Sequence, residues 1–353
     1  MAPAAMNISL ASRSFLALVL ATTGIGAAHA QLPAASTPAS AINAPRAGGG
    51  PLPADASAAP GQKIPFRLRA DVDLVLVEAT VRDQHGGIVD DLTQQDFHIY
   101  EDGVEQKIST FSRDELPLAV ALVLDCSGSM DPILRQLSHV AVETLSPLKP
   151  NDEVALFDFA ARADLRVGLT RDRHRIAERI ATIRAAGGTV IPDALFEAAS
   201  YLGSAAPERR HAIILVSDND NTLKGYADES DVIREALEAQ AVIYSIRVQP
   251  GPPSHEMGVI LPIFRDVSVS RIIEETGGEV ISAANIEAIR PAMTAIITRL
   301  KRRYSLGYYS TNHRHDGAFR EIAVHVAEDS PNPNRKYTIS VRRGYFAPNE
   351  NRE

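Results

Sequence analysis

A buried strand followed at once by polar side chains constrains this chain more than any other feature. The run Leu118–Leu124 holds only apolar residues, which is typical of a strand buried on both faces. Asp125, Ser127 and Ser129 follow it at alternating positions, just before a predicted helix. Oxygen donors without imidazole favour Mg²⁺, Ca²⁺ or Mn²⁺ over zinc or copper. The stretch therefore predicts a site for a hard divalent cation at the end of a buried strand.

Strands and helices alternate from about residue 116 to residue 302. Such alternation predicts an α/β fold with a doubly wound, mostly parallel sheet and helices on both faces. A helix marked by Ile176, Ile180 and Ile183 is expected to end at Gly187-Gly188, and a short helix is expected from Asp193 to Leu202. The other expected strands are 153–159, 165–169, 212–216 and 241–248, and the other expected helices are 131–145, one around 232–237, and 291–302.

Patterns typical of β-strands flank this region on both sides. Strands are expected at 73–81, at 96–100 and, after a turn at Glu101-Asp102-Gly103, at 104–111, and again after Tyr304. Neither segment is long enough to bury a core alone. We therefore expect a small flanking β domain built from both ends of the chain. The predicted organisation is a signal peptide at 1–30, a linker at 31–62, β segments at 63–113 and 303–353, and an α/β domain at 114–302.

The first thirty residues have the three parts of an export signal. Arg13 precedes the apolar run Phe15–Ala21, and Ala28-His29-Ala30 offers small residues where a signal peptidase cuts, before Gln31. An uncleaved membrane anchor is the alternative, but the apolar run is short for a span. We expect a periplasmic or secreted protein with no stable membrane span after cleavage.

Charge and cysteine content exclude several classes of protein. The net charge of -8 argues against a nucleic-acid surface and against a polybasic membrane patch. Cys126 is the single cysteine, so an intramolecular disulfide is impossible. We interpret Cys126 as a small, half-buried filler, with a reactive thiol as the alternative.

Two further loops offer oxygen donors after buried segments. Gly187-Gly188-Thr189 combines glycines that permit close backbone approach with a hydroxyl, and Asp218 directly follows the strand that ends at Ser217. Ligands of such sheets bind beyond the carboxyl ends of the strands, so these loops are expected to meet the loop of Asp125 there.

Together the three loops resemble the metal-ion-dependent adhesion site of the von Willebrand factor A family. The resemblance covers about residues 114–302, and the flanks at 96–103 and 343–346 are similar to bacterial exported VWFA-related domain proteins. The family usually has glycine where this chain has Asn219. Asparagine tolerates left-handed backbone, so we expect the turn to form, with Asp220 facing solvent.

The resemblance implies how an ion would be held and used. It implies that Ser127 and Ser129 bind the cation directly, and that Asp125, Thr189 and Asp218 bind it directly or through water. Mg²⁺ is the first expectation, with Ca²⁺ and Mn²⁺ as alternatives. By the same resemblance, an Asp or Glu of a protein partner completes the coordination.

An enzyme is the less favoured interpretation. Ser127-Gly128-Ser129 lacks the nucleophile-elbow pattern of hydrolases, and the sequence has no phosphate loop with a lysine and no dinucleotide fingerprint. We expect a metal-dependent, adhesion-type binding module without catalytic residues. A metal-free envelope scaffold remains an alternative, because each polar residue could simply cap a strand end or turn. A metal-dependent hydrolase is the other.

Overall fold

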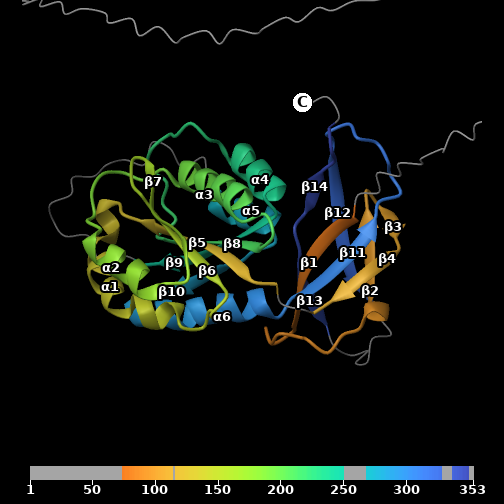
Figure 1. The fold of residues 1–353 in the computed structure, drawn as a ribbon, viewed down its shortest axis with the longest axis horizontal. Coiled ribbons are helices and arrows are strands. Elements are labelled where there is room, and N and C mark those ends of the chain that lie inside the picture. The colour runs from red at the N-terminus through yellow and green to blue at the C-terminus, as the bar shows by residue number, and fades with distance from the viewer. Residues whose placement is uncertain (1–73, 114–115, 250–267, 328–335, 350–353) are drawn as a thin grey trace, which may run out of the picture. The chain divides into compact units, whose positions relative to one another are not determined.

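The described parts of the chain form one six-stranded sheet and two four-stranded sheets (Figure 1). This computed structural model describes residues 74–113, 116–249, 268–327 and 336–349. The predicted signal peptide, the linker and the start of the N-terminal β segment lie outside the described residues. The predicted fold class is confirmed: a mostly parallel sheet with a flanking β domain from both chain ends.

The six-stranded sheet has the order β10-β9-β8-β5-β6-β7. Neighbouring strands are parallel except β6 and β7, which are antiparallel at one edge. Every residue of β5 is buried, as expected for a strand covered on both faces. The strands are β5 (Leu118–Asp125), β6 (Glu153–Phe159), β7 (Ala163–Thr170), β8 (Arg210–Ser217), β9 (Ala241–Val248) and β10 (Val280–Ala283).

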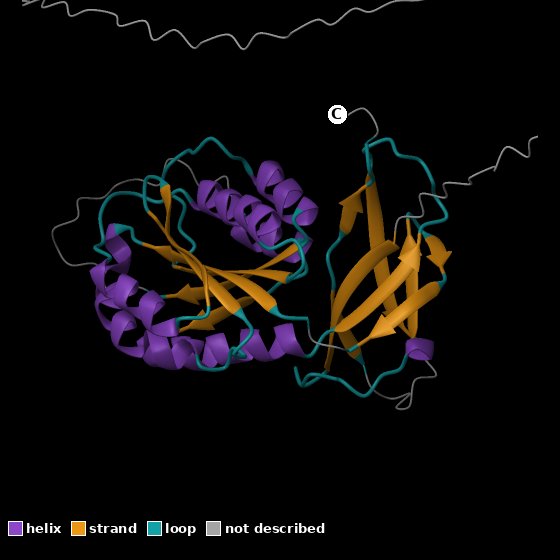
Figure 2. Ribbon diagram, in the orientation of Figure 1, coloured by secondary structure: helices purple, strands orange, loops and turns teal. Residues whose placement is uncertain are grey.

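Helices cover both faces of this sheet (Figure 2). The face toward α1, α2 and α6 carries the larger side chains of β5, such as Leu122 and Leu124. The opposite face carries Ala119 and Ala121, which lie in one cluster with the alanines of α3. Small side chains on both surfaces allow the helix to lie close to the sheet. The helices are α1 (Asp131–Leu145), α2 (Arg173–Thr182), α3 (Ile191–Ala205), α4 (Glu229–Glu238), α5 (Val269–Glu275) and α6 (Ile289–Lys301).

Several boundaries differ from the sequence prediction. Helix α2 ends at Thr182, so Gly187-Gly188 lies in the loop after the helix and not at its end. Helix α3 begins at Ile191, two residues before the predicted start, because the side chain of Asn221 accepts a hydrogen bond from the Ile191 amide. Helix α5 and strand β10 were not predicted, because seven and four residues are too few to show a clear hydrophobic periodicity.

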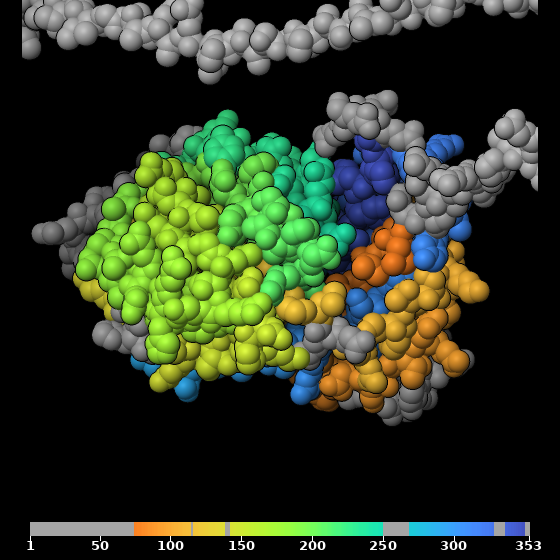
Figure 3. Space-filling view, viewed as in Figure 1, coloured from red at the N-terminus to blue at the C-terminus, as the bar shows by residue number. Residues whose placement is uncertain are grey.

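The two four-stranded sheets enclose a separate core. Their orders are β13-β1-β11-β4 and β14-β12-β2-β3. Strands from the two chain ends alternate in the first sheet, and in the second two C-terminal strands lie beside two N-terminal strands. In Figure 3, atoms of the N-terminal strands (orange) and the C-terminal strands (blue) lie together on one surface. The core includes Val77, Ile99, Tyr304 and Val324. The strands are β1 (Leu74–Asp83), β2 (Phe97–Glu101), β3 (Val104–Gln106), β4 (Ile108–Ser112), β11 (Tyr304–Tyr309), β12 (Phe319–Val326), β13 (Tyr337–Ser340) and β14 (Gly344–Phe346).

Polar contacts join this β-sandwich to the α/β unit. The buried guanidinium of Arg303 donates to the Tyr244 hydroxyl at 2.8 Å and to the Thr80 hydroxyl at 3.1 Å. Glu279 forms ion pairs with Arg82 of β1 and Arg299 of α6, both at 2.8 Å. Because a buried donor must be hydrogen-bonded, the bonds from Arg303 to β1 and to β9 favour one placement of these strands.

A buried carboxylate organises the sandwich core. Glu101 is 2% exposed and accepts hydrogen bonds from the hydroxyls of Tyr308 (2.8 Å), Ser310 (2.6 Å) and Tyr345 (3.0 Å). Burial, together with the bond to Glu101, raises the pKa of Tyr308, and burial raises the pKa of Tyr345 to about 12. All three donors come from the C-terminal part of the chain, so Glu101 links the two ends.

We predict that Glu101→Ala lowers the free energy of unfolding by about 2 to 4 kcal/mol, because it leaves buried hydroxyls without an acceptor. Tyr345→Phe, a matched removal of one donor, should cost about 1 kcal/mol. Urea denaturation followed by circular dichroism measures both values. Equal stability of Glu101→Ala and the parent chain would contradict the role of this carboxylate.

Candidate metal centre

Asp125 ends the central strand β5 and is fully buried. Its Oδ1 accepts a hydrogen bond from the Ser127 amide at 2.8 Å, and its Oδ2 accepts one from the Ser217 hydroxyl at 2.6 Å. Ser217 ends the neighbouring strand β8, so two strand ends are joined through this carboxylate. The two hydrogen bonds fix its orientation at the carboxyl edge of the sheet.

Ser127, Ser129 and Asp218 form a continuous chain of oxygen atoms at this edge. The hydroxyl oxygens of Ser127 and Ser129 lie 3.0 Å apart, and the Ser129 hydroxyl donates to Asp218 Oδ2 at 2.7 Å. Ser127 precedes the short 3-10 helix η2 (Gly128–Met130), which turns the chain from β5 into α1. Four of the five predicted metal-site residues are thus linked by hydrogen bonds, since Asp125 is bonded to the Ser127 amide.

Thr189, the fifth residue, lies in a loop tied to both other loops by its backbone. The Ala186 amide donates to the Cys126 carbonyl of the first loop at 2.8 Å, and the Thr222 amide of the third loop donates to the Thr189 carbonyl at 3.1 Å. Gly187 has φ +79°, a left-handed conformation that favours glycine. The Thr189 side chain is buried, but the structure records no hydrogen bond from its hydroxyl to Asp125 or Asp218.

The third loop forms the expected turn at Asn219. Asn219 has φ 62°, and its side-chain oxygen accepts a hydrogen bond from the Ser245 hydroxyl at 2.9 Å. Its amide donates to the Ser217 hydroxyl oxygen at 2.9 Å. Asp220 is exposed, as predicted. Asparagine therefore supplies the left-handed residue and an additional bond to β9.

Sequence reasoning missed three residues that hold these loops. Ser217 bonds to Asp125, and Asn221 accepts from the Ile191 amide at 2.9 Å. Asp193, interpreted only as a helix start, accepts from the amides of Tyr226 (3.3 Å) and Ala227 (3.0 Å) and so anchors the segment after the third loop. Ser217 alone had a sequence signal, since it is a polar residue ending a buried apolar strand.

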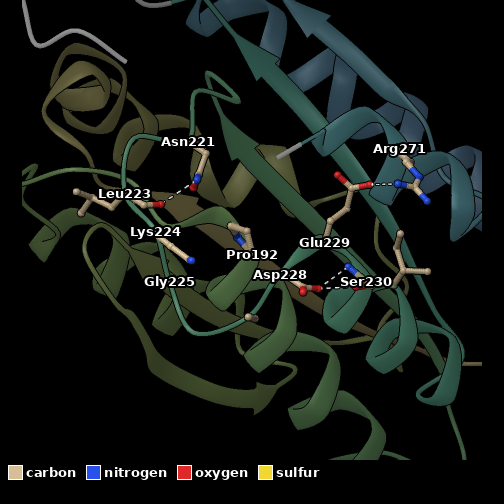
Figure 4. Close-up of a pocket in the computed structure, with 11 residues that line it drawn as sticks. Pro192, Asn221, Leu223, Lys224, Gly225, Asp228, Glu229, Ser230 and Arg271 are labelled. Atoms are coloured by element: carbon tan, nitrogen blue, oxygen red, sulfur yellow. Dashed lines mark hydrogen bonds and ion pairs between the residues drawn. The ribbon is translucent and has the colours of Figure 1, made fainter. Parts of the chain in front are cut away.

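A cavity of about 630 Å³ lies beside the third loop (Figure 4). Its wall includes Leu223, whose amide donates to the Thr189 carbonyl at 3.0 Å, so the cavity adjoins the proposed metal loops. Glu229 and Arg271, which form an ion pair at 2.7 Å, lie together in the lining of the cavity, and Lys224 lines it near Leu223. The cavity therefore has polar and apolar surface next to the site.

Asp125 is a buried acidic side chain without a cationic side chain beside it in the described part of the chain. Burial raises the pKa of Asp125 to about 6, nearby Asp218 raises it further, and the bonds from Ser217 and Ser127 oppose the shift. Among the ion pairs of the described residues, none includes Asp125 or Asp218. Two carboxylates near enough for one to raise the pKa of the other suit a divalent cation.

The chemistry of the donors fits a hard ion. Carboxylate and hydroxyl oxygens from Asp125, Ser127, Ser129 and Asp218 are the ligands that Mg²⁺ and Ca²⁺ prefer. In the described ranges, no group of three or more His, Cys, Asp and Glu side chains is arranged to hold a metal. Burial raises the pKa of the Cys126 thiol, which disfavours a reactive thiolate beside the site.

Comparisons with known proteins find a similarity within the α/β region. A family model described as "von Willebrand factor type A domain" matches residues 120–221. No curated protein matches the chain.

Similar solved structures are distant. An aerotolerance-related membrane protein from Bacteroides fragilis is 18% identical over 52% of this chain and 99% of its own, with a TM-score of 0.41. A von Willebrand factor type A protein from Catenulispora acidiphila is 12% identical, covering 79% of this chain and 74% of its own (TM-score 0.43). The vWF domain of the type V pili tip protein Mfa5 from Porphyromonas gingivalis is 20% identical over 31% and 40%, with a TM-score of 0.28.

The raised pKa of Asp125 predicts how the metal-free protein responds to pH. A folded-state pKa of about 6, against 3.8 for the unfolded chain, means that the folded state holds the proton more tightly. The resulting stabilisation is fully present below pH 3.8 and is lost as pH rises through about 6, a change on the order of 3 kcal/mol.

Urea denaturation of chelator-treated protein across this pH range measures the effect. Asp125→Asn, which cannot titrate, should lose this part of the pH dependence. An identical pH slope for the parent chain and Asp125→Asn would show that Asp125 does not titrate as inferred.

Proposed function

Because a von Willebrand factor type A family model matches residues 120–221, we propose that this chain is an exported, metal-dependent protein-binding module of the adhesion type. The proposed cation is Mg²⁺, with Ca²⁺ or Mn²⁺ as alternatives, and the proposed partner is a protein that presents an Asp or Glu side chain. The observation that carries the proposal is the chain of oxygens from Ser127 through Ser129 to Asp218, beside the uncompensated carboxylate of Asp125.

The residues that would hold the cation include neutral hydroxyl donors and charged carboxylate donors. The hydroxyls of Ser127 and Ser129 would bind it as neutral donors, and Asp218, Asp125 and Thr189 would bind it directly or through water. When bound, the cation supplies a positive centre that accepts a further carboxylate. Only two acidic side chains belong to this set. Together with the neutral hydroxyls they would leave the cation able to attract the carboxylate of a partner.

Other residues would keep the loops in place for binding. Ser217 orients Asp125, Asn219 forms the turn after Asp218, and Asp193 anchors the segment that follows. Loops fixed before binding lose less conformational freedom when a partner docks, which favours affinity. The cavity beside Leu223 and Lys224 offers room for partner residues that flank the acidic side chain.

Binding explains the arrangement better than hydrolysis does. The Ser129 hydroxyl is committed to the Asp218 carboxylate, and Ser127 lies against Ser129. His211 is buried, with both ring nitrogens bonded to backbone carbonyls, so it is not available as a base for either serine. We therefore propose that the chain is not an enzyme.

Export is the proposed location, because residues 1–30 have the pattern of a signal peptide. In the part of the chain that the structure describes, no helix is long and apolar enough to cross a membrane.

We predict that Asp218→Ala lowers the affinity for Mg²⁺ at least roughly tenfold, since it removes a charged donor from the proposed site. Asp220→Ala is the matched control, because Asp220 lies two residues away on the same loop and is exposed. Isothermal titration of the purified protein with Mg²⁺ measures both. Equal losses in the two variants, or none in Asp218→Ala, would favour the metal-free scaffold.

A second prediction concerns the partner. Immobilised protein should retain an envelope protein in the presence of Mg²⁺ and release it on addition of EDTA, and Asp218→Ala should retain much less than Asp220→Ala. Quantitative mass spectrometry of the eluates measures the difference. Retention that is insensitive both to EDTA and to Asp218→Ala would contradict binding through the cation.

A further inference from the structure

Two histidines lie directly opposite one another on the outer face of the β-sandwich. His98 of β2 and His325 of β12 are register partners in an antiparallel pair. Their neighbours Ile99 and Val324 are buried in the sandwich core, so the histidines point to the other face of the sheet. Cα atoms of such partners lie about 4.5 to 5.5 Å apart, which brings two imidazoles within reach of one ion.

Glu105 orients the ring of His98. Its Oε1 lies 2.7 Å from Nδ1 of His98, and it belongs to β3, on the side of β2 away from β12. The two nitrogens of an imidazole point in nearly opposite directions, so Nε2 of His98 is turned away from β3. A carboxylate on one ring nitrogen is the usual support of a metal-binding histidine, because it fixes the tautomer and raises basicity at the other.

The His325 ring is held beside an open hollow. Its centroid lies 5.5 Å from that of Tyr100 at an interplanar angle of 72°, an edge contact that restricts the ring. Among the described residues, no hydrogen bond engages its nitrogens. His325, Tyr100, Ala323 and Glu321 line a hollow of about 440 Å³, which leaves room for water or another ligand.

We propose that His98 and His325 form a second metal site that takes a transition-metal ion, Zn²⁺ or Cu²⁺, through two imidazole nitrogens. Imidazole suits these ions, whereas the oxygen donors around Asp125 suit hard ions. No group of three or more His, Cys, Asp and Glu side chains in the described residues is arranged as a metal site, so the remaining ligands are water or an external molecule.

Such an ion would link strands from the two ends of the chain. β2 belongs to the N-terminal strands and β12 to the C-terminal strands, and the sequence has no cysteine pair to join them. An ion that binds only the folded state raises the free energy of unfolding, and the increase grows with the logarithm of the ratio of ion concentration to Kd. The site is independent of the proposed partner binding.

Titration of the full chain with Zn²⁺ alone, monitored by isothermal calorimetry in an Asp125→Asn background, tests the site. We expect one Zn²⁺ per chain, at least a tenfold loss of affinity in His98→Ala and in His325→Ala, and a loss of about tenfold in Glu105→Gln. His174→Ala, which removes an exposed histidine from α2, should leave the affinity unchanged.

Cu²⁺ electron paramagnetic resonance provides a second readout. Hyperfine coupling to two nitrogens is expected in the parent chain and to one in His325→Ala, and circular dichroism confirms that each variant is folded. Zn²⁺ binding that persists unchanged in the folded His98→Ala and His325→Ala variants would overturn the proposal. So would a signal without imidazole nitrogen.

Discussion

The buried carboxylate of Asp125 is the constraint on which the edge of the central sheet depends. It ends β5 inside the protein, where an isolated charge is costly. It is oriented by the Ser127 amide in the loop after β5 and by the Ser217 hydroxyl at the end of β8. The loops of Ser127, Thr189 and Asp218 close around it through backbone and hydroxyl contacts. A carboxylate in this position favours a cation more strongly than an exposed one, because water competes less for either charge.

The parts of the fold that local patterns predict are those in which neighbours in sequence share one environment. Strand β5 was predictable because all its residues are buried, and the polar residues after it marked the sheet edge. The start of α3 was not, because the partner that caps Ile191 is Asn221, thirty residues further along the chain. Asp193 was misjudged for the same reason, since its hydrogen bonds reach Tyr226 and Ala227.

The third loop shows how local backbone preference and tertiary contacts act together at one residue. A turn there needs a positive φ, and asparagine meets that need with a side chain that also bonds to Ser245. The predicted tolerance of the backbone was correct, but the bond to β9 was not predictable, because it depends on which strand lies beside β8. Residue preference thus predicted the left-handed conformation of Asn219, and the tertiary fold determined its hydrogen bond to Ser245.

The pairing of N-terminal with C-terminal strands in the β-sandwich has a mechanical consequence. Residues 74 and 346 both lie in the sandwich, and the α/β unit is inserted between its strands. A pulling force applied to the two ends would load strand pairs such as β1 with β11 before it reached β5 or the loops around Asp125. Tension along the chain would therefore pass through the sandwich strands and not through the proposed binding surface.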